Sequence, residues 1–213
     1  DVIARSCVKC PSTSEGGKRP ELLSFNETYK YVVVVFFLRT QARYVLTDLN
    51  GNTLLVREVS FRDASDIDTC IKDACEQVAR ILTEQKLDAA KDLCGISILI
   101  DGVVNAGLGT VEYPIHNSTW KPGRQIMDQF EAYFPETDNI MIENSGRLWS
   151  QRFLEMHAEL SVGRVLAFYT GMANTAGVLL DNGVIVHGAN CLIGEFGHMT
   201  MPNAGQAVMC ECG

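Results

Sequence analysis

The sequence predicts an α/β fold made of two units of similar organisation. Segments rich in β-branched and aromatic residues, typical of strands, alternate with segments whose apolar residues recur every three to four positions, typical of amphipathic helices. Three strand-like segments come first, a helix, a strand and a helix follow, and a second run of strands closes the chain. The length of 213 residues suits one large or two modest domains.

Three strands are expected to open the first unit, at Tyr31–Leu38, Ala42–Thr47 and Thr53–Phe61. The Asn50-Gly51 pair between the last two is a strong hairpin signal, because both residues tolerate the positive φ that tight hairpin turns need. We therefore expect these strands to be antiparallel neighbours.

A long helix is expected to begin near Ser65, whose hydroxyl can cap the first turn, with Asp68 at the third helical position. Its apolar positions fall on one face and should pack on the sheet. They are Ile67, Ile71, Cys75, Val78 and Leu82.

A continuous apolar strand is expected at Cys94–Ile100 and a second helix at Lys121–Phe134. A short strand at Asn139–Glu143 and a third helix at Ser145–Leu160 follow. The boundary between the two units is expected near Pro135–Asn139.

The second unit is expected to contain strands at Arg164–Thr170, Ala176–Leu180 and Val184–His187, with a turn at 181–183. This order of elements is that of the actin-like ATPase, or ribonuclease H-like, architecture, in which two lobes close on a cleft. Residues 28–135 would form the amino-terminal lobe and residues 136–213 an incomplete carboxy-terminal lobe.

Composition narrows the class of protein. The formal net charge of −8 and the pI near 5.0 argue against a nucleic-acid surface within these residues, because phosphate binding needs clustered Lys and Arg. The longest apolar run, Val32–Leu38, is far shorter than the ~20 residues of a membrane helix. Eight cysteines in a chain of this size do not suggest a secreted disulfide framework. We expect a soluble, cytoplasmic protein without membrane contact.

A metal-binding pattern lies near the end of the sequence. His198, within Gly194–His198, is followed by Cys210-Glu211-Cys212-Gly213. An imidazole and two thiols suit tetrahedral zinc, which takes four ligands when its role is structural. The fourth ligand would come from beyond Gly213, from elsewhere in the fold, or from water. The alternative is that the two cysteines are simply buried thiols.

The order Gly-Glu-x-Gly-His, then Cys-x-Cys-Gly, resembles the signature of the ROK family of repressors, open reading frames and sugar kinases. The resemblance is closest to its transcriptional repressors of the N-acetylglucosamine and xylose repressor kind. It implies that His198, Cys210 and Cys212 hold zinc with a further cysteine, and that Glu195 and His198 face a bound sugar. Because that last cysteine would lie past Gly213, we expect the protein to continue there.

The same resemblance implies further sugar contacts. Gly102 follows Asp101 where the family usually has Pro-Gly closing on the sugar. Asn117, three positions before Trp120, matches an asparagine that hydrogen-bonds a sugar hydroxyl, although a plain loop turn explains it equally well. Asn144 would orient a sugar hydroxyl.

Ser145 stands where sugar kinases of the family have the aspartate that deprotonates the attacking hydroxyl. A serine has no accessible basic form at neutral pH, and losing a positioned base typically costs ~100- to 10,000-fold in rate. Ser145 instead suits a helix cap. No catalytic residue is therefore assigned, and we expect no carboxylate in the cleft that is placed to deprotonate a sugar.

The two turns that bind ATP phosphates in this fold also lack most of the residues that they need. ATP phosphates in this fold lie against a glycine-bearing hairpin, whereas residues Phe37–Gln41 contain neither glycine nor an acidic residue for magnesium. Residues Thr170–Gly177 resemble the second phosphate loop only loosely, keeping Gly171 and Gly177. We therefore expect no ATP.

Residues 1–27 are polar and aperiodic around Ser12–Pro20, which is typical of a linker. They resemble the stretch that joins a winged helix-turn-helix to the sugar-binding body of ROK repressors, while a flexible tail without significance is the alternative. Operator DNA would then be bound by a domain outside these residues.

These observations predict a sugar-sensing effector domain of a ROK-type transcriptional repressor, which binds a small sugar or sugar phosphate and forms a homodimer or homotetramer. Two alternatives stay open. One is an ATP-dependent, glucokinase-like sugar kinase of the same family that uses Glu195 or another residue as base. The other is a zinc-stabilised scaffold with a vestigial cleft.

Overall fold

The computed structural model describes residues 2–5, 23–114, 120–160, 162–170 and 175–199. Three of the predicted site residues lie outside these ranges: Asn117, Cys210 and Cys212.

The first unit is built on a five-stranded sheet in the order β10-β6-β3-β4-β5. Its strands are β3 (Tyr31–Phe37), β4 (Gln41–Asp48), β5 (Thr53–Ser60), β6 (Leu93–Ile100) and β10 (Ile140–Asn144). The strands β3, β4 and β5 form antiparallel pairs, while β6 is parallel to both β3 and β10. The predicted strands and the α/β class are confirmed.

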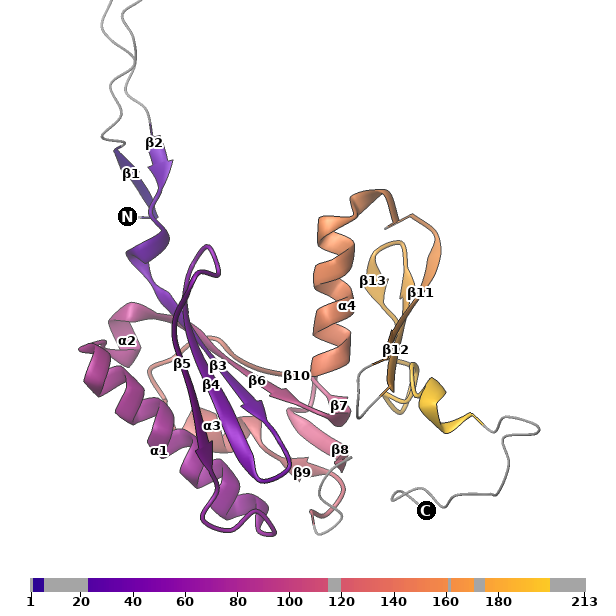
Figure 1. Ribbon diagram of the computed structural model, residues 1–213, viewed down its shortest axis with the longest axis horizontal. Helices are drawn as coiled ribbons and strands as arrows, with labels where there is room; N and C mark the ends of the chain where they lie inside the picture. The colour runs from indigo at the N-terminus through magenta and orange to yellow at the C-terminus, as the bar shows by residue number, and fades with distance from the viewer. Residues whose placement is uncertain (1, 6–22, 115–119, 161, 171–174, 200–213) are drawn as a thin grey trace, which may run out of the picture.

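Helices α1 (Ile67–Gln85), α2 (Ala89–Asp92) and α3 (Met127–Tyr133) belong to this unit (Figure 1). The predicted helix cap at Ser65 is wrong, because the Asp66 carboxylate accepts from the Thr69 backbone N–H at 3.1 Å. Helix α1 buries its apolar face against the sheet, and both contribute to one continuous core. Its fully buried side chains include Val33, Val35, Tyr44, Ile71, Val78 and Ile98.

The single helix predicted over Lys121–Phe134 is wrong in its first half. Gly123 takes a φ of +71°, and Arg124–Gln125 form a short strand, β9, before α3 begins. Strand β9 pairs with β8 (Thr110–Pro114), which pairs with β7 (Gly102–Asn105). Residues 124–125 are not helical because their backbone pairs with β8 and completes this small sheet.

Strand β10 also lies beyond the boundary expected near Pro135–Asn139. It pairs with β6 over five residues, so the chain leaves the first sheet only at Asn144. The amino-terminal segment differs from a plain linker as well, because β1 (Ile3–Arg5) pairs with β2 (Leu23–Phe25).

The second unit follows directly. Helix α4 (Ser145–Met156) packs against a three-stranded antiparallel sheet of β11 (Arg164–Thr170), β12 (Thr175–Asp181) and β13 (Val184–Ile185) (Figure 1). Helix α4 is shorter than predicted, because the chain departs from helical backbone angles at His157 and continues as a separate short 3-10 helix. In the described part of the chain, no helix combines the length and the apolar character needed to cross a membrane.

Candidate functional site

A cleft of about 270 Å³ lies where the two units meet. Its walls come from the end of β3 and the turn after it, the residue after β6, the first two turns of α4, the start of β12 and the loop before the last 3-10 helix. Its ionisable, amide and hydroxyl side chains are Asp101, Asn144, Ser145, Arg147, Thr175 and Glu195. Among these polar residues, the sequence had singled out Asn144, Ser145 and Glu195.

Asn144 fixes the amino-terminal end of α4. Its side-chain oxygen accepts from the Arg147 backbone N–H at 3.1 Å, and its amide nitrogen donates to the Gly102 carbonyl at 2.7 Å. The prediction that Ser145 caps the helix is wrong, because Asn144 is the cap and Ser145 is the first helical residue. The amide oxygen and nitrogen of Asn144 thus both form hydrogen bonds within the protein, and the sugar contact predicted for Asn144 stays a prediction.

The hydroxyl of Ser145 donates to the carboxylate of Asp101. Asp101 and Glu195 both belong to the lining of the cleft, and the expectation that no carboxylate is placed to deprotonate a sugar stays a prediction. Sequence reasoning missed Asp101, although a signal was present: an acidic residue replaces the proline that the family usually has there.

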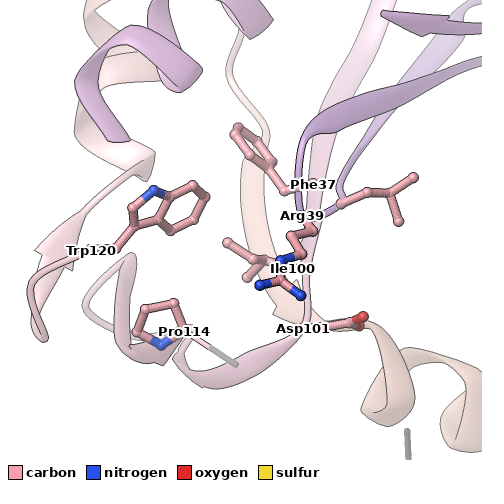
Figure 2. Close-up of a pocket in the computed structure, with 7 residues that line it drawn as sticks. Phe37, Arg39, Ile100, Asp101, Pro114 and Trp120 are labelled. Atoms are coloured by element: carbon pink, nitrogen blue, oxygen red, sulfur yellow. The ribbon is translucent and has the colours of Figure 1, made fainter. Parts of the chain in front are cut away.

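Asp101 also borders a second pocket of about 10 Å³, shared with Arg39, Phe37 and Trp120 (Figure 2). This volume holds no more than a water-sized group. The Trp120 ring is buried, lies edge-on to Phe37 with centroids 6.3 Å apart, and donates to the Ala64 carbonyl at 3.3 Å. Trp120 is therefore held in place directly after residues 115–119, which lie outside the described residues.

The residue at position 102 must be glycine because of the backbone conformation and the close packing there, and Gly102 is not among the residues that line the cleft. Its φ is +145°, and a Cβ there would collide with the Tyr113 carbonyl of the neighbouring strand. Gly102 is buried and its carbonyl faces the Asn144 amide. Its predicted contact with a sugar stays a prediction.

The loop that carries Glu195 is held against β12 by close glycine contacts. Gly194 has a φ of +109°, and a Cβ on it would collide with the Gly177 carbonyl. A Cβ on Gly177 would in turn enter the ring of Phe196. Gly177, loosely assigned to a phosphate loop from sequence, thus permits this packing, which places Glu195 at the cleft; Gly171 lies outside the described residues.

His198 is close to Glu195, with 3.8 Å between its Nε2 and the carboxylate Oε2. Within the described ranges, no three His, Cys, Asp or Glu side chains gather in a way that could hold a metal ion. His198 belongs to these ranges, whereas the two cysteines do not. One imidazole and two thiols remain a suitable donor set for zinc, so the zinc site stays a prediction.

Arg147 connects the parts of the site. Its side chain is 4% exposed and its Nη1 lies 3.3 Å from Glu143 Oε1. The guanidinium also donates to the Val104 carbonyl at 2.9 Å and to the Cys191 carbonyl, in the loop that leads to Glu195. Sequence reasoning overlooked this residue, because Glu143 ends a strand while Arg147 lies in the helix that follows, so no helical spacing joins them.

The turn after β3 offers little to a phosphate group. Leu38 donates its backbone N–H to the Gln41 carbonyl at 2.9 Å, and its side chain lines the cleft. Triphosphate sites use several free backbone amides at glycine-rich turns. This turn, residues 38–40, has no glycine and its first amide is already bound.

Comparison with known proteins agrees with this architecture. Residues 38–213 match the family model described as ROK family. The chain is 26% identical to the xylose repressor of Bacillus subtilis (strain 168), a match covering 94% of this chain and 50% of the repressor. It is 22% identical to the xylose repressor of Staphylococcus xylosus, covering 87% and 46%. The chain thus spans about half the length of these relatives.

Solved structures show the same fold. A ROK family transcriptional regulator, described as a homolog of the E. coli MLC protein, superposes with a TM-score of 0.72 at 19% identity over 92% of this chain and 47% of its own. A ROK family glucokinase from Streptomyces griseus, in complex with glucose and AMPPNP, gives 0.65 at 18% identity, over 86% and 54%. These likenesses show the fold, and the match to the family model over most of its length shows that the chain belongs to the ROK family.

Proposed function

We propose that the chain is part of the sugar-sensing body of a cytoplasmic ROK-type transcriptional repressor. The observation that carries the proposal is that the cleft has groups suited to binding a sugar and lacks those that bind a triphosphate. Ser145 and Glu195 offer hydrogen-bonding groups for a carbohydrate, whereas the turn that would receive a triphosphate presents Leu38 and no glycine. The names of the xylose repressors support the same choice.

In this proposal the sugar acts by shifting a population of conformations. A ligand moves an equilibrium only if it binds one arrangement of the two units more tightly than the other. Arg147 joins elements of both units, so a change in their arrangement would be transmitted through α4. In a homodimer or homotetramer, this change would alter the spacing of DNA-binding domains that lie outside these residues.

The competing function is an ATP-dependent sugar kinase, and the carboxylate of Asp101 beside Ser145 is the observation that favours it. Incubating the full-length protein with ATP, magnesium and a panel of pentoses, hexoses and N-acetylhexosamines separates the two. We expect sugar binding by calorimetry without sugar-dependent phosphate transfer. Rapid transfer would establish a kinase, and no heat with any sugar would favour a scaffold.

Zinc would order the loop that carries Glu195 and thereby support sugar binding. His198 would supply the imidazole ligand, and Cys210 and Cys212 the thiolates. Substituting Cys210→Ser is expected to lower both the zinc content, measured by mass spectrometry, and the sugar affinity. Unchanged sugar affinity in zinc-free protein would refute this coupling.

A further inference from the structure

We infer that Asp101 is the carboxylate that binds sugar hydroxyls in the cleft, and that it selects an uncharged sugar over a sugar phosphate. This inference rests on the proposed sugar-binding function and adds the class of ligand and the residue that discriminates it.

The position of Asp101 is set by the sheet. Strands β6 and β10 run parallel, and Ile100 pairs with Asn144 at their ends. Asp101 and Ser145 are therefore the next residues on two adjacent strands, at the carboxyl edge where ligands of open α/β sheets bind. Their hydrogen bond follows from this register, so the pair is held by the two strands that carry it.

The pair presents hydrogen-bond acceptors to the cleft. The proton of the Ser145 hydroxyl is directed to Asp101, so the serine oxygen has only lone pairs left to offer. A carboxylate accepts several hydrogen bonds, and bonds to a charged acceptor are stronger than neutral ones. Sugar hydroxyls are donors and match this arrangement, whereas phosphate oxygens are acceptors and do not.

The charges around the cleft favour the same ligand class. Asp101 and Glu195 bring two carboxylates to the lining. Arg147 is the one basic side chain among the described residues of that lining, and its guanidinium is already bound to Glu143 and to two backbone carbonyls. Arg39 borders the small neighbouring pocket together with Asp101 and does not belong to the lining of the cleft (Figure 2). A phosphorylated sugar would thus meet a lining of net negative charge.

The test is calorimetry on the full-length protein with uncharged pentoses and hexoses and with their phosphate esters. The wild type should bind one uncharged sugar at least about tenfold more tightly than its phosphate. Asp101→Asn should lower the affinity for that sugar by roughly 10- to 100-fold, because a hydrogen bond to a charged acceptor is lost. It should also reduce the ratio between the affinities for the sugar and for its phosphate. Asp138→Asn changes the net charge equally at an exposed site away from the cleft and should leave both affinities unchanged.

A deoxy-sugar series identifies the hydroxyl involved. The analogue that lacks the hydroxyl bound by Asp101 should bind the wild type weakly and should lose no further affinity in Asp101→Asn. Asp101→Ser serves as a second variant if Asp101→Asn does not fold, as judged by circular dichroism.

The outcomes are distinguishable. A sugar that binds the wild type and Asp101→Asn equally overturns the inference alone, as does a sugar phosphate that binds the wild type more tightly than the sugar. Absence of binding by every sugar and phosphate overturns the proposed function, and this inference with it.

Discussion

Replacing Arg147 by methionine should destabilise the protein strongly, because it leaves a buried carboxylate without its partner. The side chains of Arg147 and Glu143 are 4% and 11% exposed. Methionine fills much of the same volume but donates no hydrogen bond to Glu143, to the Val104 carbonyl or to the Cys191 carbonyl. Breaking a buried ion pair from one side typically costs about 3–5 kcal/mol.

Helix α4 supplies a matched control. Arg152 and Glu155 form a second ion pair with the same Nη1–Oε separation of 3.3 Å, but their side chains are 66% and 55% exposed. Exposed pairs contribute about 0–1 kcal/mol, since water screens them in both states. Both substitutions remove an ion pair of the same separation, but the Arg147 pair is buried and Arg147 also donates to two backbone carbonyls.

The free energy of unfolding of each variant can be measured by urea denaturation followed by circular dichroism. Arg147→Met should lose several times more than Arg152→Met. Adding Glu143→Gln to Arg147→Met should recover part of the loss, because no lone charge then remains buried. Equal losses for the two single variants would refute the assignment of Arg147 as a buried connector.

Three other perturbations test particular contacts. Gly177→Ala should lower both the melting temperature and the sugar affinity, because its methyl group would enter the ring of Phe196 in the loop that carries Glu195. Gly197→Ala is the control and should be tolerated, since the nearest atom to its methyl group would be 3.7 Å away. Equal melting temperatures of the two variants would contradict the packing role of Gly177. Asp66→Ala should cost about 0.5–2 kcal/mol in urea unfolding as the loss of a helix cap, and Ser65→Ala much less; the reverse order would restore the cap to Ser65. Burial raises the pKa of the Cys75 thiol from 9.0 to about 12. Between these pH values the folded protein retains a proton that the unfolded chain releases, so the free energy of unfolding is unaffected by this group below pH 9 and falls as the pH rises toward 12. Cys75→Ala should accordingly flatten the decline of unfolding free energy above pH 9, and an unchanged slope would contradict this linkage.

The elements with strong local signals were predictable. Strands β3, β4 and β5 were predictable from their content of β-branched and aromatic residues, and the structure shows that their side chains alternate in burial. The turn after β12 was predictable for a similar reason, since Asn182 and Gly183 take φ values of +49° and +79° that few other residues accept. The short motif around Glu195 likewise identified one wall of the cleft, because its residues are consecutive in the chain.

Strands β7 to β9 carried no such signal. Each is five residues or shorter, and each is defined by backbone pairing with a neighbour. Residues 124–125 are polar and directly precede a helical apolar pattern that begins at Ile126, and the ladder to β8 decides that they form a strand. Short strands depend on tertiary partners because their own propensity is too weak to decide the backbone conformation.

The sequence by itself determined the α/β class, the main strands and the family motif, since periodicity, turn residues and a short signature are properties of neighbouring positions. The tertiary structure alone decided the chemistry of the cleft. Asp101 and Ser145 are 44 positions apart, as are Arg147 and Cys191, and each pair meets only because parallel strands and the packing of α4 bring their backbones together. Contacts of this kind follow from the register of a sheet, which no local pattern specifies.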